Sequence, residues 1–154
     1  MRLLSTLSLL ALAFAATTPE GRAFLEANKA KEGVVETPSG LQYKVIKSGA
    51  EGGKSPRVNT PCLCHYKGET IDGTEFDSSF KRGKPTTFAP NQVIKGWTEA
   101  MQMMTEGDYW QLVIPSELAY GDSQRGQFIT PGAVLVFELE LIEVKGPGAV
   151  KAEL

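Results

Sequence analysis

Few residues in this chain of 154 amino acids could carry covalent chemistry. The one histidine, His65, lies in an alternating segment on the face opposite Tyr66, where we expect a surface residue rather than a general base. Cys62 and Cys64 are two positions apart, a spacing that would strain a disulfide and that makes a poor zinc site with a single histidine. Both thiols are expected to be buried and to behave as small hydrophobic groups, with a redox pair as the alternative.

The short motifs of the common catalytic and cofactor sites are absent. The sequence has no G-x-S-x-G elbow, no GxxxxGK[ST] loop, no H-E-x-x-H pair and no G-x-G-x-x-G after a predicted strand. We therefore expect no metal, no cofactor and no nucleophilic triad.

Aromatic residues are the richer signal. They recur through the chain at Tyr66, Phe76, Phe88, Trp97, Tyr109, Trp110, Tyr120, Phe128 and Phe137. The simplest explanation is that they fill the core. That explanation fits less well for FD at 76–77 directly after a turn, for VI at 93–94 before GW at 96–97, and for AYG at 119–121 in a loop.

The elements that must position these residues are mostly strands. Hydrophobic alternation predicts strands over 41–45, 61–68, 74–77, 109–114 and 133–144, and in the first of them Leu41, Tyr43 and Val45 alternate with polar Gln42 and Lys44. Helical spacing predicts a short helix from Lys95 to about Met104 and another over 19–31. We expect an α+β fold in which an antiparallel sheet has one solvated face and one face packed on the helix.

Composition narrows the class of protein. With 16 basic and 18 acidic residues the net charge is −2, which provides no field for nucleic acid or an anionic membrane. Sixteen glycines and nine prolines indicate a turn-rich chain, and the length suits one domain with short tails. No segment reaches the ~20 apolar residues that a membrane span needs.

Both ends of the chain resemble targeting signals. Arg2 followed by the apolar stretch Leu3 to Leu12 and by Ala13-Phe14-Ala15 predicts a secretory signal peptide over 1–15, with an amphipathic helix as the alternative. The last four residues, KAEL at 151–154, resemble the KDEL-type retrieval signal, although Ala152 replaces the usual acidic residue. We therefore expect the lumen of the endoplasmic reticulum, with secretion or a plastid as alternatives.

Several motifs together resemble the peptidyl-prolyl isomerase domain of the FKBP family. They are HYKG at 65–68, DGTEFDSS at 72–79, RGKPTTF at 82–88, VIKGWTEA at 93–100, IPSELAYGD at 114–122 and LVFELEL at 135–141, in family order and spacing. Residues 27–46 are similar to the Mip-type branch. The resemblance implies a curled antiparallel sheet of five to six strands wrapped around one short helix. It divides the chain into a signal peptide (1–15), a helical extension (16–35), the isomerase domain (36–146) and a tail (147–154).

The resemblance also implies a pocket between helix and sheet. Its catalytic positions would be Tyr66, Phe76, Asp77, Trp97, Tyr120 and Phe137, and its substrate-binding positions Phe88, Val93, Ile94, Phe128 and Ile129. Trp97 would be the floor under the proline ring, while the Ile94 N–H and the Tyr120 hydroxyl would hold substrate carbonyls. Asp77 would accept a hydrogen bond from Tyr66 and pair with Arg82. The sequence departs from the family pattern at Thr86, Phe128 and Thr130, which affects the expected pocket wall, loop shape and macrolide affinity.

The expected function is peptidyl-prolyl cis-trans isomerisation of proline-containing polypeptides, by a monomer that also binds rapamycin-type macrolides. The alternative is a binding module that uses the same pocket without turnover. A lipocalin-like carrier is a weaker hypothesis, because it needs a roomier barrel and more strands.

Overall fold

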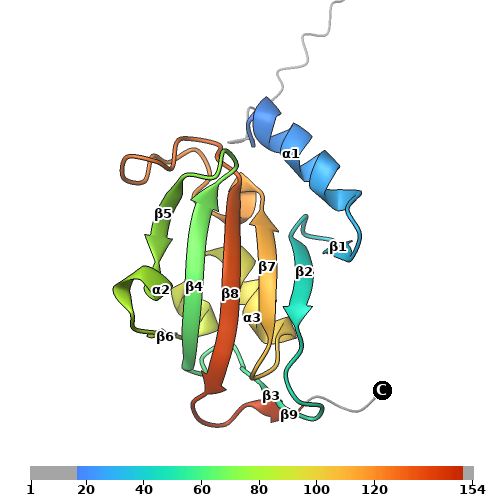
Figure 1. The fold of residues 1–154 in the computed structure, drawn as a ribbon, viewed down its shortest axis with the longest axis vertical. Helices are drawn as coiled ribbons and strands as arrows, with labels where there is room; N and C mark the ends of the chain where they lie inside the picture. Colours follow the sequence, from blue (N-terminus) through green and yellow to red (C-terminus); the bar gives the residue numbers. More distant parts are fainter. Residues whose placement is uncertain (1–16, 151–154) are drawn as a thin grey trace, which may run out of the picture.

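The fold is an antiparallel sheet that curls around one helix (Figure 1). The computed structural model describes residues 17–150, so the predicted signal peptide and the KAEL tail lie outside the described residues. Within that range the main sheet has seven strands in the order β1-β2-β7-β8-β4-β5, with β6 paired to β4. Their bounds are β1 Val34–Glu36, β2 Gln42–Lys47, β4 Cys62–Thr70, β5 Glu75–Ser78, β6 Thr86–Phe88, β7 Tyr109–Ile114 and β8 Leu135–Val144.

The remaining elements are short. Strands β3 (Lys54–Ser55) and β9 (Ala149–Val150) form a separate pair. The helices are α1 (Pro19–Lys29), α2 (Ser79–Arg82) and α3 (Lys95–Met103), with single 3₁₀ turns at Pro90–Gln92 and Ser116–Leu118. No helix within residues 17–150 is long and apolar enough to cross a bilayer.

The predicted α+β class and curled antiparallel sheet are confirmed, but the sheet has more strands than the five or six expected. β1 and β6 account for the difference, and each has only three residues. Alternation over three residues is too short to be recognised, and these strands exist because β2 and β4 offer them backbone partners. β1 also follows directly on the helix predicted for the extension.

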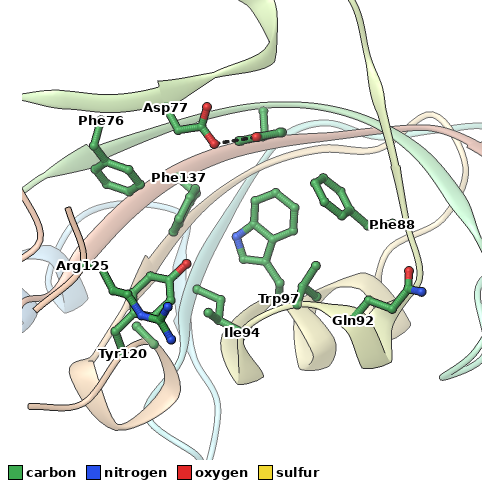
Figure 2. A pocket seen from close by; sticks show the side chains of 12 residues that line it. Phe76, Asp77, Phe88, Gln92, Ile94, Trp97, Tyr120, Arg125 and Phe137 are labelled. Carbon is green, nitrogen blue, oxygen red and sulfur yellow. Dashed lines mark hydrogen bonds between the residues drawn. The ribbon is translucent and has the colours of Figure 1, made fainter. Parts of the chain in front are cut away.

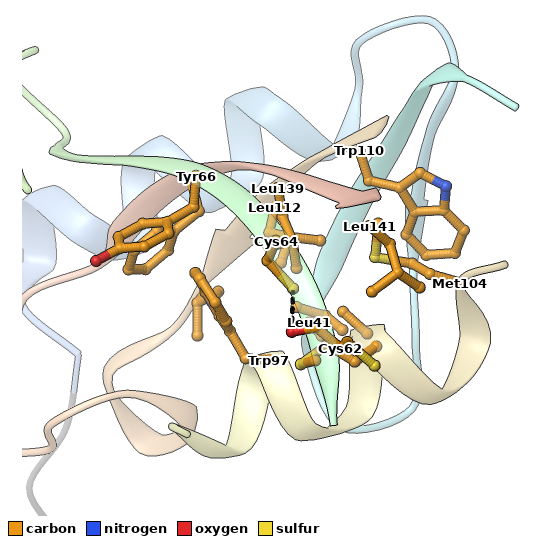
Figure 3. Packing of buried hydrophobic residues seen from close by; sticks show 14 of the residues in the cluster. Leu41, Cys62, Cys64, Tyr66, Trp97, Met104, Trp110, Leu112, Leu139 and Leu141 are labelled. Atoms are coloured by element: carbon orange, nitrogen blue, oxygen red, sulfur yellow. Dashed lines mark hydrogen bonds between the residues drawn. The ribbon is translucent and has the colours of Figure 1, made fainter. Parts of the chain in front are cut away.

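The core lies between the inner face of the sheet and α3 (Figure 3). Cys62, Cys64 and Tyr66 alternate inward along β4, as predicted, and neighbouring strands add a row of leucines. Helix α3 packs closely because it has glycine at position 96. A Cβ there would lie 2.7 Å from the Ile114 side chain on β7.

His65 differs from its prediction. It is half-buried rather than solvated, its Nδ1 lies 2.8 Å from the Ser79 hydroxyl, and its ring stacks on Phe80 with centroids 4.5 Å apart. Helix α2, a single turn with no hydrophobic periodicity of its own, covers that part of β4 and creates this environment.

The outer face of the sheet is not fully solvated, because α1 covers one corner of it. Leu25 on α1 packs against Val113 and Val134 in a second hydrophobic cluster. The alternation in β2 does not match burial throughout: Leu41, just before the strand, is buried in the core as its apolar type suggests, but Gln42 is 0% exposed beneath α1 and Val45 is 42% exposed. The Gln42 amide accepts a hydrogen bond from Asn28 Nδ2 (2.8 Å) and donates to the Leu25 carbonyl (3.0 Å), so burial leaves it satisfied.

Candidate active site

A cavity of about 560 Å³ lies between the start of α3 and the inner face of the sheet (Figure 2). It brings together nine of the eleven residues proposed from the sequence: Tyr66, Phe76, Asp77, Phe88, Val93, Ile94, Trp97, Tyr120 and Phe137. These residues come from strands β4, β5, β6 and β8, from helix α3 and the segment that leads into it, and from the loop after the 3₁₀ turn at Ser116–Leu118. The expected clustering is therefore present.

Trp97 forms the floor of this cavity. It is 4% exposed and meets three rings edge-on: Tyr66 at 5.2 Å, Phe137 at 5.3 Å and Phe88 at 5.8 Å between centroids. Near-perpendicular contacts of this kind hold aromatic rings in a defined arrangement. The walls are thus rigid and apolar, and the indole N–H of Trp97 has no hydrogen-bond partner within the described residues.

Gly68 makes room for one wall. A Cβ at this position would lie 2.6 Å from the Phe76 ring and 2.7 Å from the Phe137 ring, which contact each other edge-on at 5.6 Å. The sequence showed Gly68 within the HYKG motif but did not indicate this role, because the two rings come from β5 and β8.

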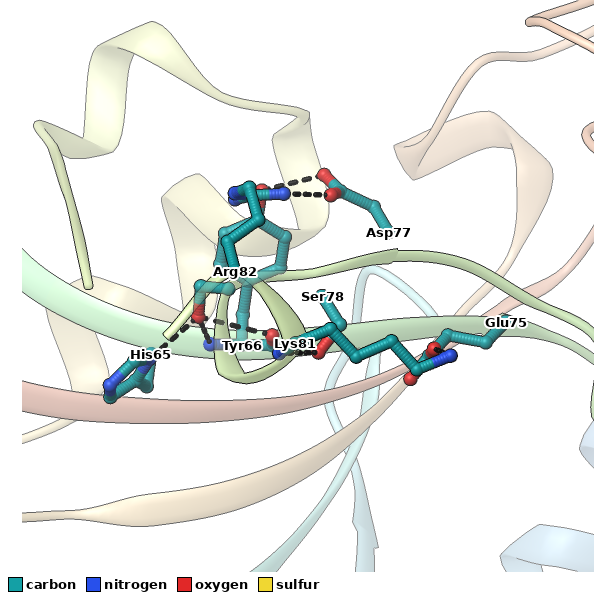
Figure 4. Close-up of polar contacts among 8 residues, drawn as sticks. His65, Tyr66, Glu75, Asp77, Ser78, Lys81 and Arg82 are labelled. Carbon is teal, nitrogen blue, oxygen red and sulfur yellow. Dashed lines mark hydrogen bonds and ion pairs between the residues drawn. The ribbon is translucent and has the colours of Figure 1, made fainter. Parts of the chain in front are cut away.

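Tyr66, Asp77 and Arg82 form a polar cluster at the rim of the cavity (Figure 4). The Tyr66 hydroxyl donates to Asp77 Oδ2 (2.6 Å), Arg82 Nη2 donates to the Tyr66 oxygen (2.9 Å), and Arg82 forms an ion pair with Asp77. Burial, and then the hydrogen bond to Asp77, raise the pKa of the Tyr66 phenol, so it stays protonated at neutral pH. The expected contacts of Asp77 with Tyr66 and Arg82 are present.

Two hydrogen-bond donors are free at the cavity. Within residues 17–150 neither the Ile94 backbone N–H nor the Tyr120 hydroxyl is engaged in a hydrogen bond. Ile94 is the N-cap of α3, so its N–H precedes the helical hydrogen-bond ladder. Polar atoms of a bound peptide could therefore find partners beside the aromatic walls of the cavity.

Phe128 and Ile129 lie outside the main cavity, contrary to expectation. They line an adjoining hollow of about 250 Å³, with Phe128 44% exposed and Ile129 6% exposed. A tight turn closed by two backbone hydrogen bonds between Arg125 and Ile129 (2.8 and 3.2 Å) determines their position. Of the other departures from the family pattern, Thr86 pairs with Cys64 in the sheet and Thr130 lines a third hollow, so neither borders the main cavity.

Three residues of the cavity were not predicted: Gln92, Ala119 and Arg125. Ala119 adjoins Tyr120 in the AYG motif and could have been included, whereas nothing in the local sequence distinguishes Gln92 or Arg125. Within residues 17–150, no group of three histidine, cysteine or acidic side chains could hold a metal ion.

Comparison with known proteins agrees with this geometry. The family model described as FKBP-type peptidyl-prolyl cis-trans isomerase matches residues 52–142, and a model described as the domain amino terminal to it matches residues 11–45. A macrophage infectivity potentiator from Trypanosoma cruzi is 51% identical over 128 residues, which cover 83% of this chain and 65% of that protein.

Solved structures agree with the fold. The crystal structure of FkpA from Escherichia coli aligns with a TM-score of 0.77 at 40% identity and covers 82% of this chain and 58% of that one. A peptidyl-prolyl cis-trans isomerase from Pseudomonas syringae aligns with a TM-score of 0.76 at 40% identity, covering 82% of this chain and 92% of that one. The chain spans less than two thirds of the length of the first curated relatives it matches.

Proposed function

This chain belongs to the FKBP-type peptidyl-prolyl cis-trans isomerase family, and we propose that it is itself an isomerase of peptide bonds that precede proline. The observation that supports this most directly is the cavity: an indole floor, aromatic walls and two free hydrogen-bond donors. Such a site can bind and desolvate a peptide, but it presents no group that would react with it.

The reaction requires no reactive group. Rotation about an X-Pro bond is slow because it breaks amide resonance, with a barrier of ~18–20 kcal/mol. The planar amide has more charge separation than the twisted one, so transfer into an apolar pocket favours the twisted form. Lowering the barrier by ~4–7 kcal/mol gives roughly 10³- to 10⁵-fold acceleration.

In this proposal each part of the cavity has a role. Trp97 supports the proline ring, and Tyr66, Phe76, Phe88 and Phe137 exclude water around it. The Ile94 N–H and the Tyr120 hydroxyl hold substrate carbonyls, and such positioned donors contribute beyond desolvation. Asp77, held by Arg82, orients Tyr66 at the rim.

The cellular setting is part of the proposal. Residues 1–15 would direct the chain into the secretory pathway and KAEL would return it to the endoplasmic reticulum, where a monomer would assist protein folding. The division of the chain at residues 15, 35 and 146 is likewise a proposal, made from the two terminal signals and from the resemblance to the family. Deleting residues 151–154 from a tagged chain should cause its secretion, and continued retention would contradict the retrieval role.

Replacing Trp97 with leucine tests the catalytic proposal. The Trp97→Leu variant should lose at least about tenfold in kcat/KM on a proline-containing peptide, which corresponds to ~1.4 kcal/mol of transition-state stabilisation. Trp110→Leu is the matched control, because Trp110 is equally buried but stacks on Tyr43 outside the cavity. Phe137→Tyr, which adds a hydroxyl to the wall, should also reduce turnover.

The outcomes separate the two functions. If both tryptophan variants are folded by circular dichroism and only Trp97→Leu loses turnover, the cavity is the catalytic site. Equal turnover in Trp97→Leu and the unaltered chain would contradict the assignment. If the unaltered chain binds rapamycin or a proline peptide without accelerating isomerisation, the pocket is a binding module.

A further inference from the structure

Arg125 is the feature of the cavity that the proposed reaction does not use. It lines the main cavity and also the adjoining hollow, so it lies where the two meet. Its guanidinium carbon lies 5.0 Å from the centroid of the Tyr120 ring, a cation–π contact that keeps the charge beside a pocket residue (Figure 2). Within residues 17–150 no acidic side chain forms an ion pair with it.

The charge of Arg125 is not compensated by the other ionic groups of the site. Asp77 is the one acidic residue among those that line the cavity, and both of its oxygens are engaged, by Arg82 and by Tyr66. The rim with Arg82 is therefore neutral, and the rim with Arg125 has one positive charge. Because the whole chain has a net charge of −2, this local charge is opposite in sign to the overall charge of the molecule.

The backbone of Arg125 belongs to a closed turn. Its N–H donates to the Ile129 carbonyl (2.8 Å), and its own carbonyl accepts from the Ile129 N–H (3.2 Å). The side chain therefore extends from a closed turn over the Tyr120 ring rather than from an open loop. Because the Tyr120 ring already restricts this side chain, ordering it for an ion pair costs less than ordering an arginine without such a contact.

A peptide in the main cavity would pass Arg125 when it leaves toward the adjoining hollow. The two hollows share Phe76, Asp77, Tyr120 and Arg125, so they form one continuous surface for an extended chain. A carboxylate in that chain is the natural partner of a guanidinium, which it can meet with two parallel hydrogen bonds.

We propose that Arg125 is a specificity-determining residue that selects peptide segments with aspartate or glutamate next to the proline. This proposal rests on the proposed function in one respect: it assumes that the proline of the substrate binds in the main cavity. It names the substrate class as acidic proline-containing segments.

The test compares peptides that differ by one charge. Two matched pairs are measured, with glutamate or glutamine directly before the proline and with the same two residues directly after it. The dissociation constant is measured by calorimetry and kcat/KM by an uncoupled isomerase assay. In the unaltered chain the glutamate peptide of at least one pair should be favoured about threefold, as expected for a partly exposed ion pair.

Three variants assign the preference to Arg125. Arg125→Gln should bring the glutamate-to-glutamine ratio to about one, and Arg125→Glu should reverse it. Arg57→Gln removes the same charge from an exposed residue outside the cavity and should leave the ratio unchanged. Because each ratio is formed within one variant, a general loss of activity or stability cancels.

Each result has a defined meaning. A ratio of one or less for both pairs in the unaltered chain overturns the proposal, as does a preference that persists in Arg125→Gln. The charge preference in binding without any turnover would support Arg125 as the selector and reject the isomerase function. Turnover without a charge preference would support the isomerase function and reject Arg125 as the selector. Arg125 would then serve only as a structural support for Tyr120.

Discussion

At the scale of single residues, the two cysteines illustrate how burial changes chemistry. Cys62 and Cys64 are free thiols on the inner face of β4, and each Sγ lies near a backbone carbonyl two residues earlier, at 3.4 and 3.7 Å. Burial, and then the charge of Glu106, raise the pKa of Cys62 to about 11. Burial likewise raises the pKa of Cys64 to about 12. They behave as small hydrophobic groups, as the sequence analysis expected.

Both thiols should therefore be unreactive in the native protein. At pH 8 only about one Cys62 in a thousand is a thiolate, and fewer Cys64, so a thiol reagent should modify neither on the timescale of minutes. In 6 M guanidinium both should react at once, which provides the internal control. Rapid modification of the native chain would contradict the burial of these residues.

At the scale of elements, α1 is attached to the loop that bears Tyr120 and Arg125. The Thr17 hydroxyl donates to Glu117 (2.9 Å) and lies 3.1 Å from the Ser116 hydroxyl, and Arg22 pairs with Glu117 at 2.6 Å. At the other end of the loop, the Thr18 N–H donates to the Gly132 carbonyl (3.0 Å). The start of the helix thus holds both ends of the loop.

Glu117→Gln should weaken this attachment in a pH-dependent way. Burial acts to raise the pKa of Glu117, but hydrogen bonds from its own backbone and from Thr17, together with Arg22, outweigh it and lower the pKa. The carboxylate therefore stabilises the fold above its unfolded pKa, and this contribution is lost as the pH falls through the folded value.

In urea unfolding, Glu117→Gln should lower the free energy of unfolding at neutral pH but not at acid pH. Because Glu117 is 42% exposed, solvent screening limits the expected decrease in the free energy of unfolding to a few tenths of a kcal/mol at pH 7. The decrease should vanish well below pH 4.5. Glu51→Gln, in an exposed loop, should have no such effect. A difference that persisted below pH 3 would contradict an electrostatic origin.

At the scale of the whole molecule, the sheet is covered on both faces, by α3 inside and by α1 at one outer corner. The second contact depends on Gln42, whose amide links the Asn28 side chain and the Leu25 carbonyl beneath α1. The same amide also donates to Glu36 Oε2 (3.0 Å). A buried polar residue with three partners stabilises the docked position of the helix, because removing it breaks all three hydrogen bonds.

Gln42→Leu should destabilise the protein by about 1–3 kcal/mol, although leucine is more hydrophobic. Gln111→Leu is the control, since Gln111 lies on the outer face of β7 and is partly exposed, and its effect should stay within about 0.5 kcal/mol. Chemical denaturation measures both. A neutral or stabilising Gln42→Leu would show that the amide network contributes nothing to the docking of α1.

The sequence by itself determined the long strands, helix α3 and most of the cavity. β4, β7 and β8 have enough alternating residues for a clear period, and the motifs around Tyr66, Trp97 and Phe137 have a recognisable spacing. These features are local: each is readable from about ten consecutive residues. The resemblance carried by these motifs supplied the eleven proposed site residues, and nine of them meet in one cavity.

Only the tertiary structure decided the features that depend on contacts between distant segments. Gln42 is buried because α1 packs over it, Phe128 is turned outward by the bridge from Arg125 to Ile129, and Gly68 is needed because rings from two other strands meet above it. Arg125 enters the cavity through the same loop. Such placements depend on which segments become neighbours after folding, which a local pattern of hydrophobicity does not contain.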